Sequence, residues 1–206
     1  MAMNVVGLVG WIATWVALLA VLAVYLSPGY VPLLLPFMML AFYRSFIQLA
    51  YFPWAVRMRR ILQQYPWQVL RGVERGLGQH PEAQENGPWL AFGNPAKPEE
   101  KIPLVFLRTM RRYWWTKRIG GSRTKPELKA QIEPLWFAGD PRFLGVIAAP
   151  GREGKAPKRM YVLHQRAALD RHVAPFNWGA SAQDVERARR ARARVADHDN
   201  SPSRMN

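Results

Sequence analysis

The chain carries no charged side chain before Arg44, and this absence of charge constrains its fold more than any other feature. Two apolar runs, 5–26 and 31–52, are separated by a Ser-Pro-Gly sequence that is typical of a turn. At about 1.5 Å per helical residue each run reaches about 33 Å, which matches a hydrocarbon core of about 30 Å. The sequence therefore predicts a transmembrane helical hairpin over residues 1–53.

A cleaved signal peptide is the alternative interpretation of the first apolar run. Such peptides normally begin with basic residues and have a shorter apolar core that ends in small residues. The run 5–26 has no basic residue before it and is longer than such a core. We therefore expect both runs to remain as membrane spans.

The distribution of positive charge predicts the orientation of the hairpin. All 29 Lys and Arg residues lie from Arg44 onward, and the net charge is +15. Arg57, Arg59 and Arg60 directly follow the second run, whereas the short loop has no Lys or Arg. By the positive-inside rule, the large C-terminal part is cytoplasmic, and two spans then place the N-terminus there as well. The predicted location is the cell membrane (inner or plasma membrane), as a multi-pass protein.

Several residues near the end of the second run are expected to anchor the chain at the interface. Trp54 is suited to the aromatic belt, and we expect Arg44 to extend to the interface rather than face the partner helix. Residues 54–66 are predicted to form a juxtamembrane basic helix that stops at Tyr65-Pro66. The predicted membrane anchor consists of Arg44, Trp54, Arg57, Arg59 and Arg60.

Residues 67–178 have the pattern of a small β-rich cytoplasmic domain. Short runs rich in β-branched and aromatic residues alternate with Gly and Pro, and each run has the length of a strand. These runs lie at 67–73, 88–92, 102–108, 135–139, 142–150 and 159–165. We expect a mainly antiparallel, barrel-like or curled sheet with one or two helices, so the fold class is membrane-anchored α+β.

Two segments between the predicted strands have helical character. Residues 124–132 begin with Thr124 as a candidate N-cap, followed by a proline in the first turn. Residues 108–118 are compatible with either a helix or a strand. A related pattern occurs twice, as PWLAFGNP at 88–95 and PLWFAGDP at 134–141, and each copy predicts a short strand that runs into a tight turn.

The C-terminal region, 179–206, is predicted to contain an Arg-rich helix and a disordered tail. Ser181 and Asp184 have the spacing of a capping box, and strong helix formers come after them. Ala188, Ala191 and Val195 would form a narrow apolar stripe that supports weak packing. This helix is a second candidate partner site.

The residues give no support for catalysis. The absence of cysteine excludes disulfides, thiolate ligands and a cysteine nucleophile, and the histidines have no recognised metal-ligand spacing. Neither a Walker sequence nor a GxSxG sequence occurs. A Gly-Gly turn at 120–121 is flanked by basic residues and resembles an anion site, but a solvated basic turn is the preferred interpretation. We expect no catalytic residues, no cofactor and no metal.

Basic and aromatic residues are mixed most densely at 108–125, and this stretch is the predicted contact surface for a partner or for lipid headgroups. Its members are Arg108, Arg111, Arg112, Trp114, Trp115, Lys117, Arg118, Arg123 and Lys125. Core packing of the two tryptophans, docking on headgroups, a protein partner and stacking on nucleic-acid bases are all compatible with this composition. Core packing is the interpretation given most weight, and docking comes second.

The expected function is a protein-interaction, adaptor or regulatory module at the membrane surface, not an enzyme. Its partners are an anionic bilayer and a protein, and we expect no nucleic-acid partner because no RRM, KH or helix-turn-helix pattern occurs. One alternative is an accessory subunit of a transport or secretion complex, assembled as a homo- or hetero-oligomer through the hairpin. Another is a membrane-tethered enzyme or binder that acts on a phosphorylated or nucleic-acid ligand.

Overall fold

The chain forms two compact units, residues 1–56 and residues 57–206. The computed structural model describes residues 2–25, 28–79, 86–107, 109, 112–121, 124–151, 154, 156–165, 178–193 and 195. The two units are connected through one long helix, and each has its own internal packing.

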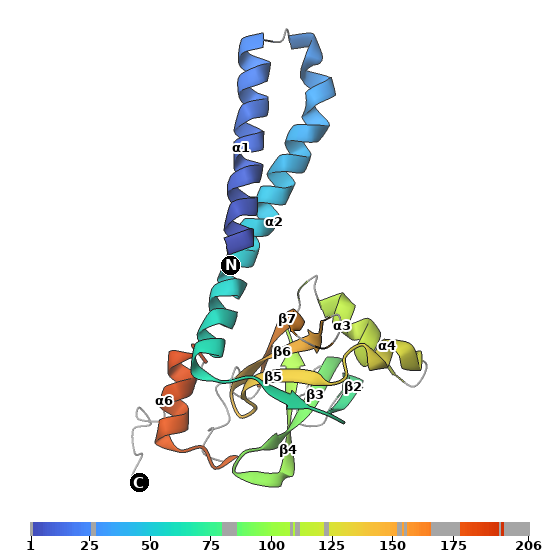
Figure 1. Ribbon diagram of the computed structural model, residues 1–206, viewed down its shortest axis with the longest axis vertical. Coiled ribbons are helices and arrows are strands. Elements are labelled where there is room, and N and C mark those ends of the chain that lie inside the picture. The colour runs from blue at the N-terminus through green and yellow to red at the C-terminus, as the bar shows by residue number, and fades with distance from the viewer. Residues whose placement is uncertain are drawn as a thin grey trace, which may run out of the picture. The chain divides into compact units, whose positions relative to one another are not determined.

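The first unit is built from two apolar helices. They are α1 (Ala2–Tyr25) and the first part of α2 (Val31–Gln64), connected through the short 3₁₀ helix η1 (Pro28–Tyr30) (Figure 1). Both helices are long and apolar enough to span a membrane, with mean hydropathies of 2.4 and 1.5 over their apolar windows. The helical character predicted for the two apolar runs is confirmed. The helix also continues through the juxtamembrane segment to Gln64, two residues before Pro66.

The two helices of this unit approach one another through a glycine and two polar side chains. A Cβ atom on Gly7 would lie 2.7 Å from the amide nitrogen of Gln48, so the Gln48 side chain lies close against the glycine backbone. The Arg44 guanidinium lies over the ring of Trp11 on α1, 5.8 Å from its centroid. Arg44 is nevertheless exposed, and its expected extension to the membrane interface stays a prediction.

Seven strands within the described residues form one antiparallel sheet in the second unit. The sheet is curled into a half-barrel and has the order β1-β5-β6-β7-β4-β3-β2 (Figure 1). Its strands are β1 (Gln68–Leu70), β2 (Glu74–Gln79), β3 (Asn86–Asn94), β4 (Lys97–Phe106), β5 (Leu135–Asp140), β6 (Leu144–Pro150) and β7 (Pro157–His164). The predicted antiparallel, barrel-like domain is thus confirmed as an open, curled sheet.

Strand β2 is the one strand in this sheet that the sequence did not predict. Its residues, ERGLGQ, are poor in the β-branched and aromatic types that indicate strands. It pairs with β3 along its whole length, and Gly76 lies opposite Trp89. A Cβ on Gly76 would lie 2.3 Å from the Trp89 ring, so the indole lies directly over the glycine backbone. The strand therefore depends on its neighbour rather than on its own composition.

The two related sequence patterns form equivalent turns, as their sequences predict. The backbone N–H of Ala96 donates to Asn94 Oδ1 at 3.0 Å, and the N–H of Arg142 donates to Asp140 Oδ1 at 3.0 Å. Each side chain thus closes a turn onto the backbone two residues later. The Asn94 side chain also donates to the Trp178 carbonyl, and that of Arg142 to the Gly179 carbonyl. Both turns therefore bind the segment that leads into the last helix.

The core of the domain lies on the inner face of the curled sheet. Phe92 and Phe137 stack there with their ring centroids 4.3 Å apart. Two helices, α3 (Arg112–Ile119) and α4 (Pro126–Ala130), come after β4. The N-cap of α4 is Lys125 rather than the predicted Thr124, and no side chain caps this helix. The buried cluster comprises Leu90, Phe92, Leu104, Phe106, Trp115, Ile119, Ile132, Leu135, Phe137, Ile147, Ala149, Tyr161 and Leu163.

The C-terminal helix α6 (Ala182–Arg190) starts as its sequence predicts. Ser181 and Asp184 form a complete capping box, in which each side chain bonds the backbone N–H of the other residue. The helix ends at Arg190, earlier than the helix-forming composition suggests. Ala188 within the helix and Ala191 directly after it are fully buried. The predicted tail, 197–206, lies outside the described residues.

Candidate functional site

Helix α3 divides the two adjacent tryptophans between the core and the surface. Trp115 is 1% exposed, packs against Phe106, and donates its indole N–H to the Arg159 carbonyl at 3.2 Å. Trp114 is only partly buried and meets Trp115 edge-on, with ring centroids 5.1 Å apart. The core-packing interpretation therefore holds for Trp115, while Trp114 remains available to surface residues.

Two arginines from different elements lie against the Trp114 ring. The Arg118 guanidinium carbon is 3.8 Å from the ring centroid, and that of Arg159 on β7 is 5.5 Å from it. Both distances are within the range of cation–π contacts, to which the negative face of the indole contributes. Neither guanidinium has an acidic partner among the described residues. The site thus brings two cations to one indole ring, without a counter-ion from the described chain.

Arg118 is the more tightly held of the two cations. Its Nε donates to Gln131 Oε1 at 2.8 Å, and its Nη1 donates to the Trp114 carbonyl at 3.1 Å. Partial burial, together with the positive charge of Arg159, lowers the pKa of Arg118 below its usual value. The guanidinium nevertheless stays charged, because an arginine pKa starts above about 12. An approaching anion would relieve the repulsion between the two arginines.

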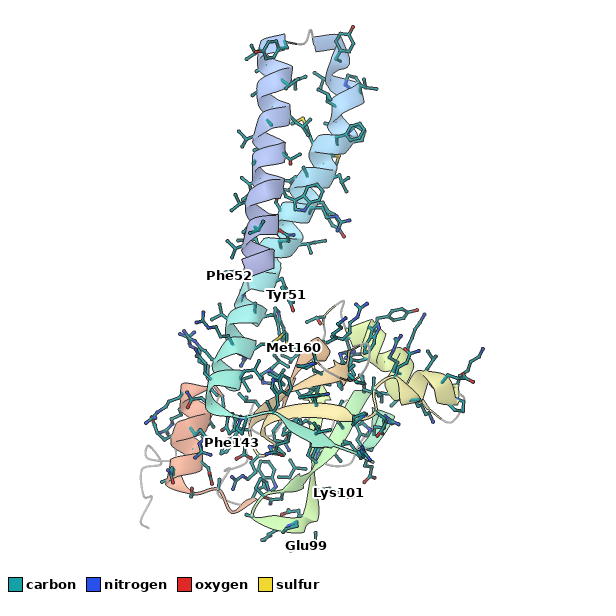
Figure 2. All side chains as sticks on the ribbon, viewed as in Figure 1. Tyr51, Phe52, Glu99, Lys101, Phe143 and Met160 are labelled. Atoms are coloured by element: carbon teal, nitrogen blue, oxygen red, sulfur yellow. The ribbon has the colours of Figure 1, made fainter. Side chains whose placement is uncertain are left out.

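A second basic-aromatic pair extends the site along α3. Lys117 Nζ lies 4.5 Å from the ring centroid of Tyr113, which is 64% exposed. Met160, which directly follows Arg159 on β7, is also exposed (Figure 2). We use the name basic-aromatic surface for Tyr113, Trp114, Lys117, Arg118 and Arg159.

The remaining residues of the predicted contact surface are placed differently. Lys125 is exposed at the start of α4. Arg112 begins α3, and its guanidinium lies beside Gly87, close enough to meet a Cβ there at 3.4 Å. Three further members lie outside the described residues: Arg108, Arg111 and Arg123.

Arg159 is the residue of this surface that the sequence interpretation missed. Arg159 is the first residue of the predicted strand 159–165. The pattern of polar and apolar residues in that strand does not indicate that Arg159 faces Trp114. Its backbone has a φ of 56°, the left-handed conformation that non-glycine residues rarely adopt. Arg159 lies where the register of β7 against β6 shifts, and only the tertiary structure brings its guanidinium to Trp114.

The predicted anchor residues after the hairpin lie on the last turns of α2. Arg57 Nη2 donates to the Arg192 carbonyl at 3.4 Å, and Arg59 is exposed. Trp54 and Arg60 are partly buried. These residues remain predicted anchors, because their contact with lipid is inferred from the sequence alone.

A separate polar cluster lies inside the domain, centred on Arg142. Its Nη2 is 2.7 Å from an Asp140 oxygen and 3.0 Å from an Asp184 oxygen. Burial lowers the pKa of Arg142, but the hydrogen bonds and charges of the two carboxylates outweigh it and raise the pKa above its usual value. Tyr65 lies nearby, and burial, together with the smaller effect of the negative charge of Asp140, raises the pKa of its phenol.

The Arg142 cluster has a structural role. It fixes α6 to the turn after β5, with the Arg142 guanidinium shared between the two carboxylates. No group of three or more His, Asp or Glu side chains suited to a metal occurs in the described part of the chain. His164 is buried on β7, and His172 and Asp170, which the sequence places near it, lie outside the described residues.

Comparisons with family models, with curated proteins and with solved structures gave no match, so the functional interpretation depends on this chain's own residues and their geometry.

Proposed function

We propose that this protein is a membrane-anchored interaction module, whose basic-aromatic surface binds an acidic segment of a protein partner. The supporting observation is the Trp114 ring with Arg118 and Arg159 against it. The Arg118 guanidinium is already held by two hydrogen bonds, so it loses little freedom on binding, and the planar fork of an arginine matches a carboxylate. The role is recognition rather than catalysis.

Several contacts favour a protein partner over direct docking on lipid headgroups. Docking through tryptophan needs an indole that is free to enter the headgroup layer. Trp115 is buried in the core, and Trp114 is partly buried against the core beneath Arg118. The exposed ring is that of Tyr113. The surface therefore offers fixed cations around an aromatic platform, an arrangement that suits carboxylate side chains.

We further propose that the hairpin holds the domain at the cytoplasmic face of the cell membrane, with both termini on that side. The two apolar helices and the basic residues after the second one support this orientation. The chain has no cysteine, so single cysteines can report topology. In Gly29→Cys, an impermeant maleimide should label intact cells; in Lys97→Cys, labelling should require permeabilised membranes. The reverse pattern would contradict the orientation.

The partner is tested by photo-crosslinking from the basic-aromatic surface. A photoreactive amino acid replaces the exposed Tyr113 in the full chain, which is irradiated in its own membranes. A protein adduct that disappears in the double variant Arg118→Gln/Arg159→Gln is the expected result. A matched control, Arg71→Gln/Lys97→Gln, removes the same charge from exposed positions and should keep the adduct.

Each other outcome of this experiment counts against the proposed partner. Adducts with lipid alone would favour docking on the bilayer. A protein adduct that survives Arg118→Gln/Arg159→Gln would show that these guanidinium groups do not bind it. Loss of the adduct in both double variants would indicate that binding depends on net charge and not on the geometry around Trp114.

The hairpin supports a second candidate function, assembly with another membrane protein. Arg44 lies within an apolar span, and the first acidic residue of the chain is Glu74, so the hairpin has no carboxylate of its own. Charged residues inside membranes usually pair with a charge or face a polar cavity. A partner helix with a carboxylate would satisfy Arg44. Co-purification of a membrane subunit that is lost in Arg44→Leu, but retained in Arg118→Gln/Arg159→Gln, would support this candidate.

A further inference from the structure

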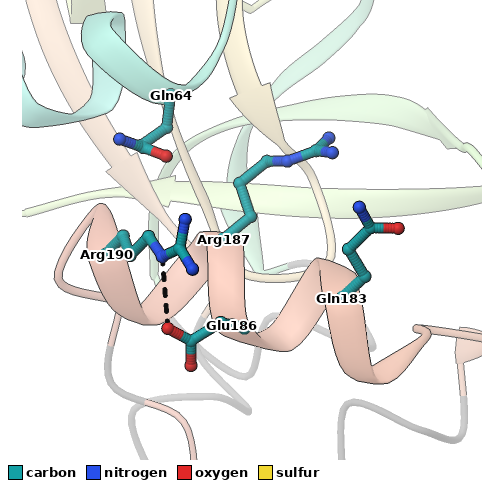
Figure 3. A pocket seen from close by; sticks show the side chains of 5 residues that line it. All are labelled: Gln64, Gln183, Glu186, Arg187 and Arg190. Carbon is teal, nitrogen blue, oxygen red and sulfur yellow. Dashed lines mark hydrogen bonds and ion pairs between the residues drawn. The ribbon is translucent and has the colours of Figure 1, made fainter.

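A small polar pocket lies where the last turn of α2 meets α6. It has a volume of about 170 Å³ and is lined by Gln64, Gln183, Glu186, Arg187 and Arg190 (Figure 3). All five residues belong to the second unit, 57–206. Pockets for organic ligands usually measure about 300 to 1,000 Å³. This pocket therefore has room for one small chemical group.

The spacing along α6 explains why several of these residues lie on one side of the helix. Positions four and three residues apart lie on the same side of a helix, which groups Gln183, Arg187 and Arg190. The opposite wall is Gln64, the last residue of α2 (Figure 3). The pocket thus combines two guanidinium groups with two amide side chains, all of which can donate hydrogen bonds.

One of the two guanidinium groups is already paired. Arg190 Nε donates to Glu186 Oε1 at 3.2 Å, and both side chains are more than half exposed. Arg187 has no ion pair among the described residues. The exposed Arg190–Glu186 pair is weak, because water and salt screen charges at the surface. A stronger anion can therefore recruit Arg190 together with Arg187.

From this donor set we infer that the pocket binds a phosphate group, with Arg187 and Arg190 as its charged ligands and Gln64 and Gln183 as neutral donors. Arginine forks bond phosphate oxygens in pairs, and such charge-assisted bonds are stronger than neutral ones. The C-terminal carbonyls of α6 disfavour an anion on the helix axis, so binding must occur on its side, where the guanidinium groups lie.

Further basic residues lie on the same two segments of the chain. Arg57 donates to the Arg192 carbonyl, which joins the last turns of α2 to the residues just after α6. The end of α2 also carries Arg59 and Arg60. Clustered positive charge raises the local concentration of anions and speeds their binding. A free phosphate and the phosphate of a lipid headgroup present the same chemistry to this pocket.

The test uses the full chain in phosphatidylcholine nanodiscs, titrated with inorganic phosphate at constant ionic strength. Binding is measured through the phosphorus NMR signal. We expect saturable binding that weakens about tenfold or more in Arg187→Gln and in Arg190→Gln, because each loses bonds to a charged group. The control Arg189→Gln removes the same charge from α6 outside the pocket and should change the affinity less than about twofold.

A charge-neutral variant separates the pocket from diffuse attraction. Gln64→Leu removes the amide donor of α2 without altering net charge, and it should also weaken binding while thermal unfolding stays unchanged. Several results would overturn the inference: no saturable binding to the wild-type chain, equal weakening in Arg189→Gln and Arg187→Gln, or unaltered affinity in Gln64→Leu. Saturation at an affinity shared by all variants would indicate an adventitious ion only.

The source of the phosphate is resolved by the lipid composition of the nanodisc. If a headgroup occupies the pocket, phosphatidic acid should abolish binding of inorganic phosphate, whereas phosphatidylserine at equal charge should preserve it. If binding persists in both lipids, the ligand is a soluble phosphate compound. These variants do not touch Arg118 or Arg159, so the phosphate site and the proposed protein partner can fail independently.

Discussion

Arg142 and Asp184 form an ion pair, 3.0 Å from Nη2 to Oδ2, that fixes the first turn of α6 to the turn after β5. Arg142 is 3% exposed and also binds Asp140, so its replacement leaves two carboxylates without their cation. We expect Arg142→Met to lower the free energy of unfolding by about 3 to 5 kcal/mol, because breaking a buried pair leaves charge uncompensated. Chemical unfolding of the full chain in detergent, monitored by tryptophan fluorescence, measures this loss.

The matched control is Arg190→Met on the same helix. Its ion pair with Glu186 is exposed on both sides, so the change should lower the free energy of unfolding by less than about 1 kcal/mol. Equal losses in the two variants would contradict the structural role assigned to the Arg142 cluster.

The pH dependence of stability should include a contribution from Asp184. Burial raises the pKa of this carboxyl group, but the hydrogen bonds from Ser181 and the charge of Arg142 outweigh burial and lower the pKa. A lowered folded-state pKa contributes stability above the unfolded value of about 3.9, and this stability is lost as the pH falls through the folded-state pKa. Asp184→Asn should therefore lower the free energy of unfolding near neutral pH. Below about pH 4 the difference in this free energy between the variant and the wild type should become smaller. Unfolding curves of both proteins from neutral pH to below pH 4 test the expectation. A difference in unfolding free energy that stays constant over this pH range would refute it.

Gly76 should not tolerate a methyl group beneath Trp89. A Cβ there would lie 2.3 Å from the indole, and overpacking of this kind costs about 1 to 3 kcal/mol. We expect Gly76→Ala to lower the thermal unfolding temperature, and Trp89→Leu in the same chain to restore part of the loss. Gly121→Ala is the control, because no heavy atom lies within 4 Å of a Cβ at that position. If Gly76→Ala has the unfolding temperature of the wild type, β2 can move away from β3.

The two faces of α3 should respond differently to truncation. Trp115→Ala removes a buried indole and its bond to the Arg159 carbonyl, so a loss of about 3 to 5 kcal/mol is expected. Tyr113→Ala removes an exposed ring and should change the free energy of unfolding by less than about 0.5 kcal/mol. Denaturant unfolding of both variants separates the core residue from the surface residue. Comparable losses would place Tyr113 in the core as well.

Local patterns predicted the elements whose own residues are sufficient to form them. The apolar runs form two helices, and the six β-branched and aromatic runs form strands near their predicted positions. The capping box at Ser181 forms because its donors and acceptors are three residues apart. The Asn94 and Asp140 turns form for the same local reason.

Other features depended on neighbours that are distant in sequence. Strand β2 forms because Trp89 covers Gly76, and no propensity within ERGLGQ indicates it. The start of α4 at Lys125 shows that a Thr-Pro-Glu pattern alone does not fix a cap. The contact of Arg44 with Trp11 likewise joins residues that are far apart in the sequence.

The sequence by itself determined the apolar hairpin, the basic character of the chain after it, and the presence of an aromatic-rich sheet domain, because these depend on composition and short-range periodicity. Tertiary structure alone decided which tryptophan enters the core, since it places Trp115 against Phe106 and the Arg159 carbonyl, and the Arg159 guanidinium against Trp114. It likewise brought Gln64 to Arg187. Such sites combine residues that only the fold makes adjacent, and local sequence carries no signal for that proximity.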